Sequence, residues 1–305
     1  MNPYRQSRIR RQLEIRAQVL RAVRAFFQNA GYLEVETPVR IPAPAPEAHI
    51  EVPPAGGWFL QASPELCMKR LLAAGYDKIF QICPSFRAGE RGDRHLPEMT
   101  LLEWYTAHAD YLDMMTQCEQ LINYIVNCLG LPGLHYQGSV IDLKGPWPRL
   151  TIAEAFARFG SLSVSRALET GRFDEILGLE IEPALGTGRP VFLYDYPVQC
   201  AALARRKPAD PDIAERFELY IAGLELCNTF SELTDPVEQR ARFEQVLSQR
   251  AVDGKPRYPQ PETFLAAVAD MPAAAGTALG IDRLVMLVAD AARIDEVVSF
   301  IPEEL

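Results

Sequence analysis

Two stretches early in the chain alternate apolar and polar residues in the way that half-buried strands do. They are Lys78–Ile82 and Met99–Tyr105, and a loop rich in glycine, arginine and glutamate, Ala88–Pro97, separates them. We therefore predict a β-hairpin, with Arg87 where the first strand enters the loop. An arginine in this place can bind a phosphate or a carboxylate through two parallel hydrogen bonds, although an ordinary surface charge would give the same pattern.

Several other segments carry apolar residues with the 3.6-residue period of amphipathic helices. Ser63, Pro64 and Glu65 have the residue types of an N-cap, a first helical position and a first turn, so a helix should begin there. Gly31 should end the first helix. We expect helices at residues 8–29, 63–72, 111–129, from the capping box at 151–154 onward, 235–250 and 281–291, and a broken helical region at 160–190.

Further strands are expected at residues 32–39, 191–196, 217–221 and 224–230. The apolar residues at odd positions between 217 and 221 should share one face of their strand. Ala222 and Gly223 form a two-residue turn into the last strand, and Pro38 places the first strand at an edge or an interface. Residues 41–57 and 130–148 hold many prolines and glycines and are predicted as loops.

The composition fits a soluble globular protein with one large domain or two. Of the 305 residues 48% are hydrophobic and 23% charged, and no apolar run reaches the ~20 residues that span a bilayer. The basic N-terminus lacks the apolar centre of a signal peptide. A net charge of −9 argues against general nucleic-acid binding, which needs a basic face. The six cysteines form no CxxC pair and are interpreted as reduced thiols of a cytoplasmic protein.

A second group of polar residues lies in the predicted strand that follows Gly223. Glu225 and Asn228 are three residues apart, so both can face one side only if the strand bulges or ends. Glu225 and Glu232, with an amide between them, suit a magnesium–triphosphate site or a cationic substrate. A solvated hairpin with charged ends would show the same residues.

Gly280–Arg283 places an arginine in the first turn of an otherwise apolar helix. The helix dipole disfavours a cation at this end. A charged residue that violates a local preference, just after a glycine that lets a ligand approach, indicates an anion-binding site. The alternative is an arginine that reaches out of a buried helix to water.

Taken together, these segments resemble the three motifs of class II aminoacyl-tRNA synthetases. Gly31 to Pro38 corresponds to motif 1, Phe86-Arg87 with Glu90 to motif 2, and Gly280 to Arg283 to motif 3, in order over nearly the whole chain. The resemblance to lysyl-tRNA synthetase extends to three segments, His95–Tyr105, Glu225–Leu233 and Gly280–Met286. It implies an α+β fold in which an antiparallel β-sheet is flanked by helices, and a homodimer formed through the N-terminal helix and the motif 1 strand.

Within this class the chain looks like the elongation factor P–(R)-β-lysine ligase family. Motif 1 begins within about the first ten residues, which leaves no room for the anticodon-binding barrel of lysyl-tRNA synthetase, so we expect one catalytic domain over residues 1–305. Ser63–Glu65, Leu102–Tyr105 and Gly276–Gly280 are also similar to segments of the ligase family. That family activates (R)-β-lysine with ATP and attaches it to a lysine of elongation factor P.

The resemblance implies ATP and Mg²⁺ as cofactors, elongation factor P as the acceptor, β-lysine or lysine as the substrate, and neither anticodon nor membrane binding. Two alternatives remain open. One is activation of lysine or another cationic amino acid for a different acceptor. The other is a synthetase-like binding protein that has lost catalysis. Pyrophosphate exchange measured with different amino acids distinguishes the three.

The resemblance also assigns roles by position. The catalytic residues are Arg87, which holds the α-phosphate and the substrate carboxylate, and Arg283, which covers the adenine and reaches the γ-phosphate. The ATP site consists of Arg87, Gly89, Glu90, Glu225, Leu226, Gly280 and Arg283. Magnesium is assigned to Glu225 and Glu232.

The implied amino-acid site consists of Ser63, Pro64, Glu65, Glu103, Tyr105, Asn228 and Glu232. Glu65 receives the amine near the carboxyl group and Asn228 the carboxylate. Glu103, Tyr105 and Glu232 surround the terminal ammonium. Carboxylates for a dication and an arginine for a carboxylate are electrostatically complementary to such a substrate.

Four positions carry residues that bear on this assignment. Gly89 stands where the family has a glutamate for the adenine amine, and Glu90 replaces it if the loop shifts by one residue. Leu96 stands in place of an asparagine, and Met99 in place of a phenylalanine that stacks on adenine, although methionine can lie flat against a ring. Ala278 replaces the glycine of lysyl-tRNA synthetases, as in the β-lysine enzymes, and reshapes the pocket.

Overall fold

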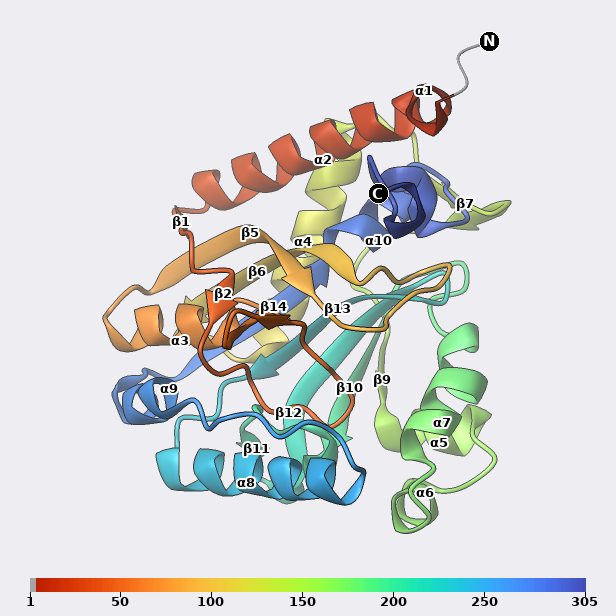
Figure 1. Cartoon of the computed structure of the whole chain (residues 1–305). Coiled ribbons are helices and arrows are strands. Elements are labelled where there is room, and N and C mark those ends of the chain that lie inside the picture. The colour runs from red at the N-terminus through yellow and green to blue at the C-terminus, as the bar shows by residue number, and fades with distance from the viewer. Residues whose placement is uncertain (1–3) are drawn as a thin grey trace.

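The protein is built around one large β-sheet with helices on both faces (Figure 1). The computed structural model describes residues 4–305. Over that range the sheet has nine strands in the order β1-β5-β6-β14-β13-β12-β10-β9, with β11 paired to β12. The strands are β1 (Leu33–Glu34), β5 (Lys78–Phe86), β6 (Glu98–Ala107), β9 (Arg149–Thr151), β10 (Val191–Pro197), β11 (Arg206–Lys207), β12 (Asp210–Ile221), β13 (Leu224–Ser231) and β14 (Ala274–Gly280).

The centre of the sheet is antiparallel. Every neighbouring pair from β5 across to β10 runs antiparallel, whereas β1 beside β5 and β9 beside β10 are parallel. The expected α+β fold, an antiparallel sheet flanked by helices, is confirmed, and a short parallel pair is added at each edge.

Strand β6 separates the two faces of the sheet through its alternating pattern. Leu102 and Trp104 are fully buried in the main core. Glu103 and Tyr105 point to the other face, where they line a cavity. The main core is covered by α2 (Arg10–Asn29), α4 (Tyr111–Cys128) and α10 (Ile281–Val288).

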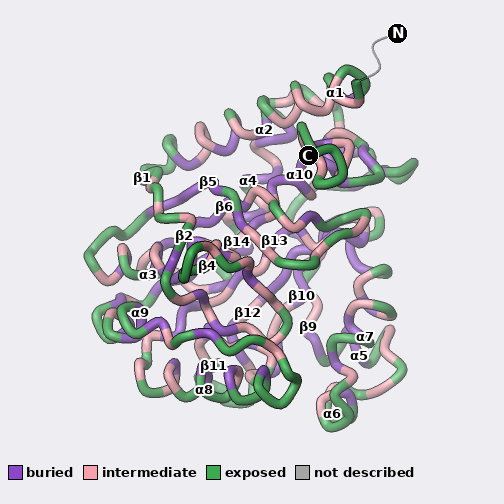
Figure 2. The backbone as a smooth tube through the Cα atoms, viewed as in Figure 1, coloured by how far each residue is buried: buried purple, intermediate pink, exposed green. Residues whose placement is uncertain are grey.

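Helices cover only part of the second face. The helices α3 (Glu65–Ala73), α8 (Pro236–Val252) and α9 (Glu262–Ala267) form a smaller core there, in which Met68, Phe243 and Phe264 pack with Ile79 and Tyr105. The loop between β2 and β3 passes in front of the remaining strands (Figure 1). Figure 2 shows the buried backbone concentrated in the central strands and the exposed residues along the outer helices and loops.

A third group of helices packs beside β9 and β10. It comprises α5 (Ile152–Phe159), α6 (Val164–Glu169), α7 (Phe173–Ile176), a π-helical turn (Leu177–Ile181) and a 3₁₀ turn (Glu182–Ala184). The broken helical region predicted at 160–190 is therefore confirmed. Thr151 and Glu154 form the predicted capping box, because each side chain accepts a hydrogen bond from the other's backbone N–H.

The other long elements also lie close to their predicted places. The helices α2, α4 and α8, the strand β10 and the β12–β13 hairpin all correspond to predicted elements. Asp235 caps α8 by accepting hydrogen bonds from the N–H groups of Val237 and Glu238. Ala222 and Gly223 both have positive φ, as a two-residue hairpin turn requires.

Three predicted elements were wrong in extent. Of the strand expected at 32–39 only Leu33–Glu34 forms, followed by one more hydrogen bond from the Val35 N–H to Phe80 at 2.9 Å. The strand ends before Pro38, which has no N–H to offer a neighbouring strand. The loop expected at 41–57 is flanked by a small sheet, with β2 (Arg40–Ile41) at its start and β3 (Pro54–Ala55) and β4 (Trp58–Leu60) at its end. The irregular region expected at 130–148 contains a hairpin of β7 (Leu134–Tyr136) and β8 (Ser139–Ile141), with positive φ at both turn residues.

Two helix boundaries also differ from the expectation. Helix α3 begins at Glu65, and Pro64 takes the N-cap position, while the Ser63 hydroxyl accepts a hydrogen bond from the Glu65 N–H at 3.0 Å. Helix α10 ends at Val288 instead of continuing to residue 291. Over residues 4–305, no helix combines the length and apolarity needed to cross a membrane. The remaining short elements are α1 (Arg5–Arg8) and the 3₁₀ turns Val198–Cys200, Val268–Asp270, Ile294–Val297 and Pro302–Glu304.

Candidate active site

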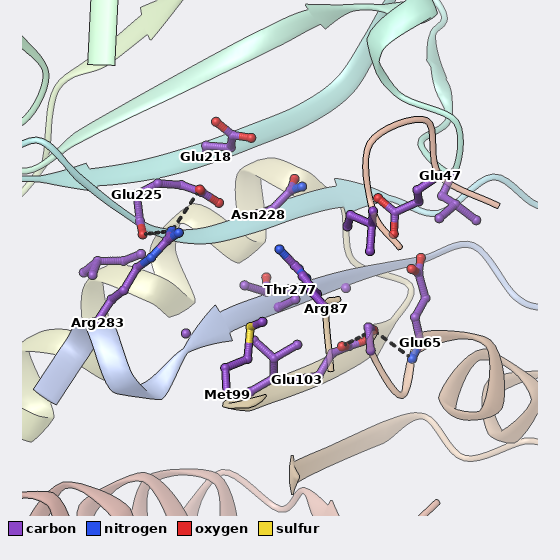
Figure 3. A pocket seen from close by; sticks show the side chains of 18 of the residues that line it. Glu47, Glu65, Arg87, Met99, Glu103, Glu218, Glu225, Asn228, Thr277 and Arg283 are labelled. Atoms are coloured by element: carbon purple, nitrogen blue, oxygen red, sulfur yellow. Dashed lines mark hydrogen bonds and ion pairs between the residues drawn. The ribbon is translucent and has the colours of Figure 1, made fainter. Parts of the chain in front are cut away.

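A cavity of about 380 Å³ opens on the partly covered face of the sheet, over β6, β14, β13 and β12. Figure 3 shows charged side chains pointing into it from the strands, from α3 and from the loops around them. The sequence-predicted residues that line it are Ser63, Glu65, Arg87, Glu90, Glu103, Tyr105, Glu225, Leu226, Asn228, Gly280 and Arg283. Pro64, Gly89 and Glu232 lie outside this lining.

Glu225 and Asn228 reach the same cavity because β13 contains a β-bulge. Leu219 and Tyr220 are successive residues of β12, yet they pair with Cys227 and Glu225, so one extra residue of β13 lies between them. Without this residue, side chains three positions apart would point to opposite faces. The β-bulge that Glu225 and Asn228 need in order to face the same cavity is therefore present.

Arg87 directs its guanidinium into the cavity from the end of β5 (Figure 3). Its ion pair with Glu90 is long, 3.8 Å from Nη1 to Oε1. The Nε atom of Arg87 is buried, and no group of residues 4–305 accepts a hydrogen bond from it. A buried donor without a partner is costly, so this guanidinium is free to bind an anion that enters the cavity.

Arg283, in the first turn of α10, is held by two neighbouring segments. Its Nη1 donates to the backbone carbonyl of Glu225 at 2.8 Å and pairs with the Glu225 carboxylate at 3.0 Å. Its Nη2 lies 2.6 Å from Nε2 of His95. Burial opposes the ionisation of Glu225, but Arg283 lowers the pKa of this carboxyl below its ordinary value. The carboxylate thus compensates for a cation at the disfavoured end of a helix.

The start of α10 is fixed by Asp282, a residue to which the sequence analysis gave no role. Its carboxylate accepts hydrogen bonds from Nη1 of Arg16 at 2.5 Å and from the backbone N–H of Thr100 at 2.8 Å. Helix α2, strand β6 and helix α10 therefore meet at one buried carboxylate. This contact sets the direction in which Arg283 leaves the helix.

Arg216 and Glu218 are two further cavity residues that the sequence analysis missed. They lie on β12, where Glu218 accepts hydrogen bonds from Arg216 and from the hydroxyl groups of Tyr196 and Tyr220, each at 2.6 Å. Burial raises the pKa of Glu218, and Arg216 opposes this rise. The signal was available: the apolar odd positions of this strand face the core, so its even positions face the opposite side.

The carboxylate pair available for magnesium is Glu218 with Glu225, and the predicted pairing of Glu225 with Glu232 is not seen. Glu225 and Glu232 are seven residues apart on one extended strand, which separates them by roughly 20 Å. Glu218 and Glu225 line the cavity from adjacent strands, and the charge of Glu225 helps to raise the pKa of Glu218. Carboxylate oxygens beside a phosphate site suit Mg²⁺, so this pair fits the ion.

The other end of the cavity is formed by carboxylates and is buried. Glu103 accepts hydrogen bonds from the Ser63 hydroxyl at 2.7 Å and from the Tyr105 hydroxyl at 2.6 Å. Burial, together with the nearby Glu65, raises the pKa of Glu103 to about 7. A buried carboxyl group with a raised pKa and space beside it is suited to receive a cation.

A buried lysine, which is not among the residues predicted for the site, lies beneath this end. The Nζ atom of Lys69 is 2.5 Å from a carboxylate oxygen of Glu65 and 2.5 Å from one of Glu232, and it lies 5.0 Å from the centre of the Phe230 ring. Lys69 is 1% exposed. Burial and neighbouring carboxylates raise the pKa of Glu232 to about 8, and Lys69 opposes that rise. The i, i+4 spacing of Glu65 and Lys69 was the visible sequence signal.

The loop after β5 places Glu90, not Gly89, in the cavity wall. Gly89 is exposed and has a φ of +78°, so it forms the turn that brings the next residue inward. Leu96 and Met99 also line the cavity. The one-residue shift considered for this loop therefore agrees with the positions of Gly89 and Glu90.

Comparison with known proteins identifies the family. The family described as tRNA synthetases class II (D, K and N) matches residues 2–304. A lysine–tRNA ligase of Moorella thermoacetica is 39% identical over 93% of this chain and 64% of that protein. The chain thus spans less than two thirds of the length of that relative.

A second group of relatives matches over nearly its whole length. An elongation factor P–(R)-β-lysine ligase of Edwardsiella ictaluri is 40% identical over 93% of both chains, and one of Sodalis glossinidius is 39% identical over 94% of both. The chain therefore belongs to the class II aminoacyl-tRNA synthetase family, in the group that holds the lysine–tRNA ligases and the elongation factor P–(R)-β-lysine ligases.

Proposed function

We propose that the protein activates (R)-β-lysine with ATP as an adenylate and transfers it to a lysine side chain of elongation factor P. The observation that carries the proposal is one cavity with a carboxylate end for ammonium groups and an arginine end for phosphates. The relatives that match over 93% of both chains support the acceptor. The six cysteines are free thiols, which fits a reducing compartment such as the cytoplasm.

In the first step, a carboxylate oxygen of the amino acid attacks the α-phosphorus of ATP. A new O–P bond forms, and the bond to pyrophosphate breaks. Arg87 and Arg283 hold the phosphates and offset the charge that develops as pyrophosphate leaves. No general base is required, because the attacking carboxylate is already ionised.

In the second step, the amine of the acceptor lysine attacks the carbonyl carbon of the adenylate. An amide bond forms, and AMP leaves with the electron pair of the C–O bond. The neutral amine that attacks gives up one proton to water, which leaves the amide N–H. Glu218 and Glu225 would hold Mg²⁺, which when bound neutralises phosphate charge. Asn228 and Arg87 would orient the substrate carboxylate.

Pyrophosphate exchange tests this function with both enantiomers of β-lysine, α-lysine and ornithine. We expect exchange with (R)-β-lysine to exceed that with α-lysine, and labelled β-lysine to appear on elongation factor P. A preference for α-lysine would instead favour the second candidate, lysine activation for another acceptor, which the lysine–tRNA ligase relatives support. Binding without any exchange would indicate a synthetase-like binding protein.

We also propose that two copies associate along α2 and β1. Strand β1 lies at the edge of the sheet, and its Leu33 side chain is 50% exposed. An exposed leucine on an edge strand suits a contact with a second copy. Light scattering should give the mass of a dimer, and Leu33→Glu should shift it toward the monomer.

A further inference from the structure

A loop of the protein passes over the cavity and is fixed from behind by a buried cation. This strap, residues 42–53, links β2 to β3 and lies in front of the sheet (Figure 1). Arg250 of α8 is fully buried and donates from Nη1 to the carbonyl oxygens of Glu47 at 2.8 Å and Ile50 at 3.0 Å. Its guanidinium also lies 4.4 Å from the centre of the Tyr258 ring.

Burying a guanidinium is unfavourable unless hydrogen bonds compensate for the lost water. The two strap carbonyls, with the carbonyl of Pro256 at 3.1 Å from Nε, supply most of that compensation for Arg250. Two more hydrogen bonds join the strap to the segment after α8, from Lys255 to the carbonyl of Ala48 at 2.7 Å and from the N–H of Val52 to the Tyr258 hydroxyl at 3.0 Å. The strap is therefore a fixed wall of the cavity in this structure.

Glu47, at the centre of the strap, sends its side chain into the cavity. Figure 3 shows its carboxylate and that of Glu65 pointing toward one another from opposite sides of one corner. No group within residues 4–305 donates a hydrogen bond to the Glu47 carboxylate or forms an ion pair with it. Burial raises the pKa of Glu47; Arg87 opposes this rise and Glu65 adds to it.

Glu65 pairs with Lys69 through one carboxylate oxygen, and Glu47 has no partner. Two carboxylates that face one another, one of them unpaired, favour a cation in the gap. The proposed substrate has three charged groups. Its terminal ammonium is matched by Glu103 and its carboxylate by Arg87. The remaining group is the ammonium nearest the reacting carboxyl group. Glu47, the cavity carboxylate without a hydrogen bond or ion pair, faces Glu65 at the corner left for it.

We propose that Glu47 and Glu65 together bind this second ammonium, and that Glu47 thereby selects diamino acids over amino acids that carry the terminal ammonium alone. The inference rests on the proposed function and adds a specificity-determining residue to it. The alternative role for Glu47 is to balance the charge of Arg87 and Arg216. In that role it would affect every carboxylic substrate equally, whether or not a second amine is present.

The test is equilibrium binding by titration calorimetry to the full-length protein, which does not depend on catalysis. The ligands are (R)-β-lysine and 6-aminohexanoate, which keeps the carboxylate and the terminal ammonium but has no second amine. We expect Glu47→Gln to raise the Kd of β-lysine by roughly 10- to 100-fold, because one partner of a buried charge contact is lost. The Kd of 6-aminohexanoate should change by less than about 2-fold.

Glu51→Gln is the matched control, since Glu51 lies on the same strap beside Arg250 but outside the cavity lining. It should leave both Kd values unchanged. Equal weakening of both ligands by Glu47→Gln, or no weakening of either, would overturn the proposal. Binding of β-lysine by the wild-type protein without any pyrophosphate exchange would contradict the proposed function instead, and the comparison of the two ligands would still decide the role of Glu47.

Discussion

The two ends of the cavity handle charge in different ways. At the ammonium end, Glu65 and Glu232 are matched internally by Lys69, and all three side chains are almost completely buried. At the phosphate end, Arg87 and Arg283 are partly exposed, with 28% and 19% of their side chains accessible. Buried charges need a closely fitting partner, whereas an open arginine site can admit and release a large polyanion.

This difference predicts how each end responds to substitution. A charge removed from the open end should change catalysis without much change in stability, because water replaces the lost contact. A charge removed from the buried end should change stability as well, because its former partner stays buried. The substitutions below test this separation.

Arg87→Ala should reduce the rate of pyrophosphate exchange by roughly 10⁴-fold, or about 5 kcal/mol of transition-state stabilisation, the size known for arginines that neutralise phosphoryl-transfer charge. The free energy of unfolding should change by less than about 1 kcal/mol, since the ion pair with Glu90 is long and partly exposed. Exchange kinetics and urea unfolding measure the two effects.

Arg91→Ala is the control for the same loop. Arg91 forms ion pairs with Glu303 and Asp295 at the surface and does not line the cavity. It should retain exchange within about 3-fold of the wild-type rate, because surface ion pairs contribute little. A similar loss in both variants would mean that the loop as a whole, and not the Arg87 guanidinium, is what matters.

Lys69→Met should lower the free energy of unfolding by about 3 to 5 kcal/mol, the cost of breaking a buried charge pair from one side. The lost ammonium leaves Glu65 and Glu232 facing each other without a cation. Urea unfolding measures the effect. Adding Glu232→Gln to this variant should recover part of the loss, because one of the two unmatched charges is removed. A single variant as stable as the wild type would show that the buried end is not held by this cation.

Much of the fold could be predicted from periodicity, but one central strand could not. The alternation around Trp104 and the helical repeats gave the hairpin and the long helices in nearly their true places. Strand β14 was not predicted, because Ala274–Gly280 has no β-branched or aromatic pattern beyond one threonine. Its small residues are required by packing: a Cβ on Gly276 would lie 2.2 Å from a Tyr105 ring carbon and 2.6 Å from a Glu232 oxygen.

The candidate site divides in the same way. Residues with a motif around them, such as Arg87 and Arg283, could be named from the sequence. Arg216 and Lys69 had only a spacing as a signal, the even positions of β12 and the i, i+4 distance from Glu65, and Glu47 had none. The importance of all three comes from strand pairing, burial and the path of a loop. The magnesium assignment of Glu232 is not supported by the structure for a similar reason. The spacing of Glu225 and Glu232 along the sequence does not give their distance in space until the segment between them is known to be an extended strand.

Glu103 makes the stability of the protein depend on pH. Its pKa is about 7 when folded, against an ordinary 4.5 when unfolded. Between these values the folded state holds a proton that the unfolded state has lost, so the free energy of unfolding falls as the pH rises, by roughly 3 kcal/mol in all. Urea unfolding at pH 5 and pH 8 should show this fall in the wild type and a smaller one in Glu103→Gln.

The same titration should affect binding in the opposite direction. The ammonium end receives a cation best when Glu103 is ionised, so the Kd of β-lysine should decrease by up to about 10-fold from pH 6 to pH 8. The Kd of ATP should not follow this titration, because Glu103 lies at the other end of the cavity. A pH dependence shared by both ligands would mean that the two ends titrate together.

Met99→Phe should have the smallest effect and act at the nucleotide end alone. Met99 lines the cavity from β6 (Figure 3), where a phenyl ring could lie against adenine. Stacking of two rings contributes about 0.5 to 1.5 kcal/mol, so the KM for ATP should fall by roughly 2- to 10-fold, with the KM for β-lysine unchanged.

Ala278→Gly is the counterpart at the amino-acid end, since Ala278 pairs with Glu103 and Asn228 across neighbouring strands. It should change the KM for β-lysine and leave that for ATP. If either variant changed the KM for ATP and the KM for β-lysine together, the two ends would act as one coupled site. The phosphate end and the ammonium end would then differ in burial but not in function.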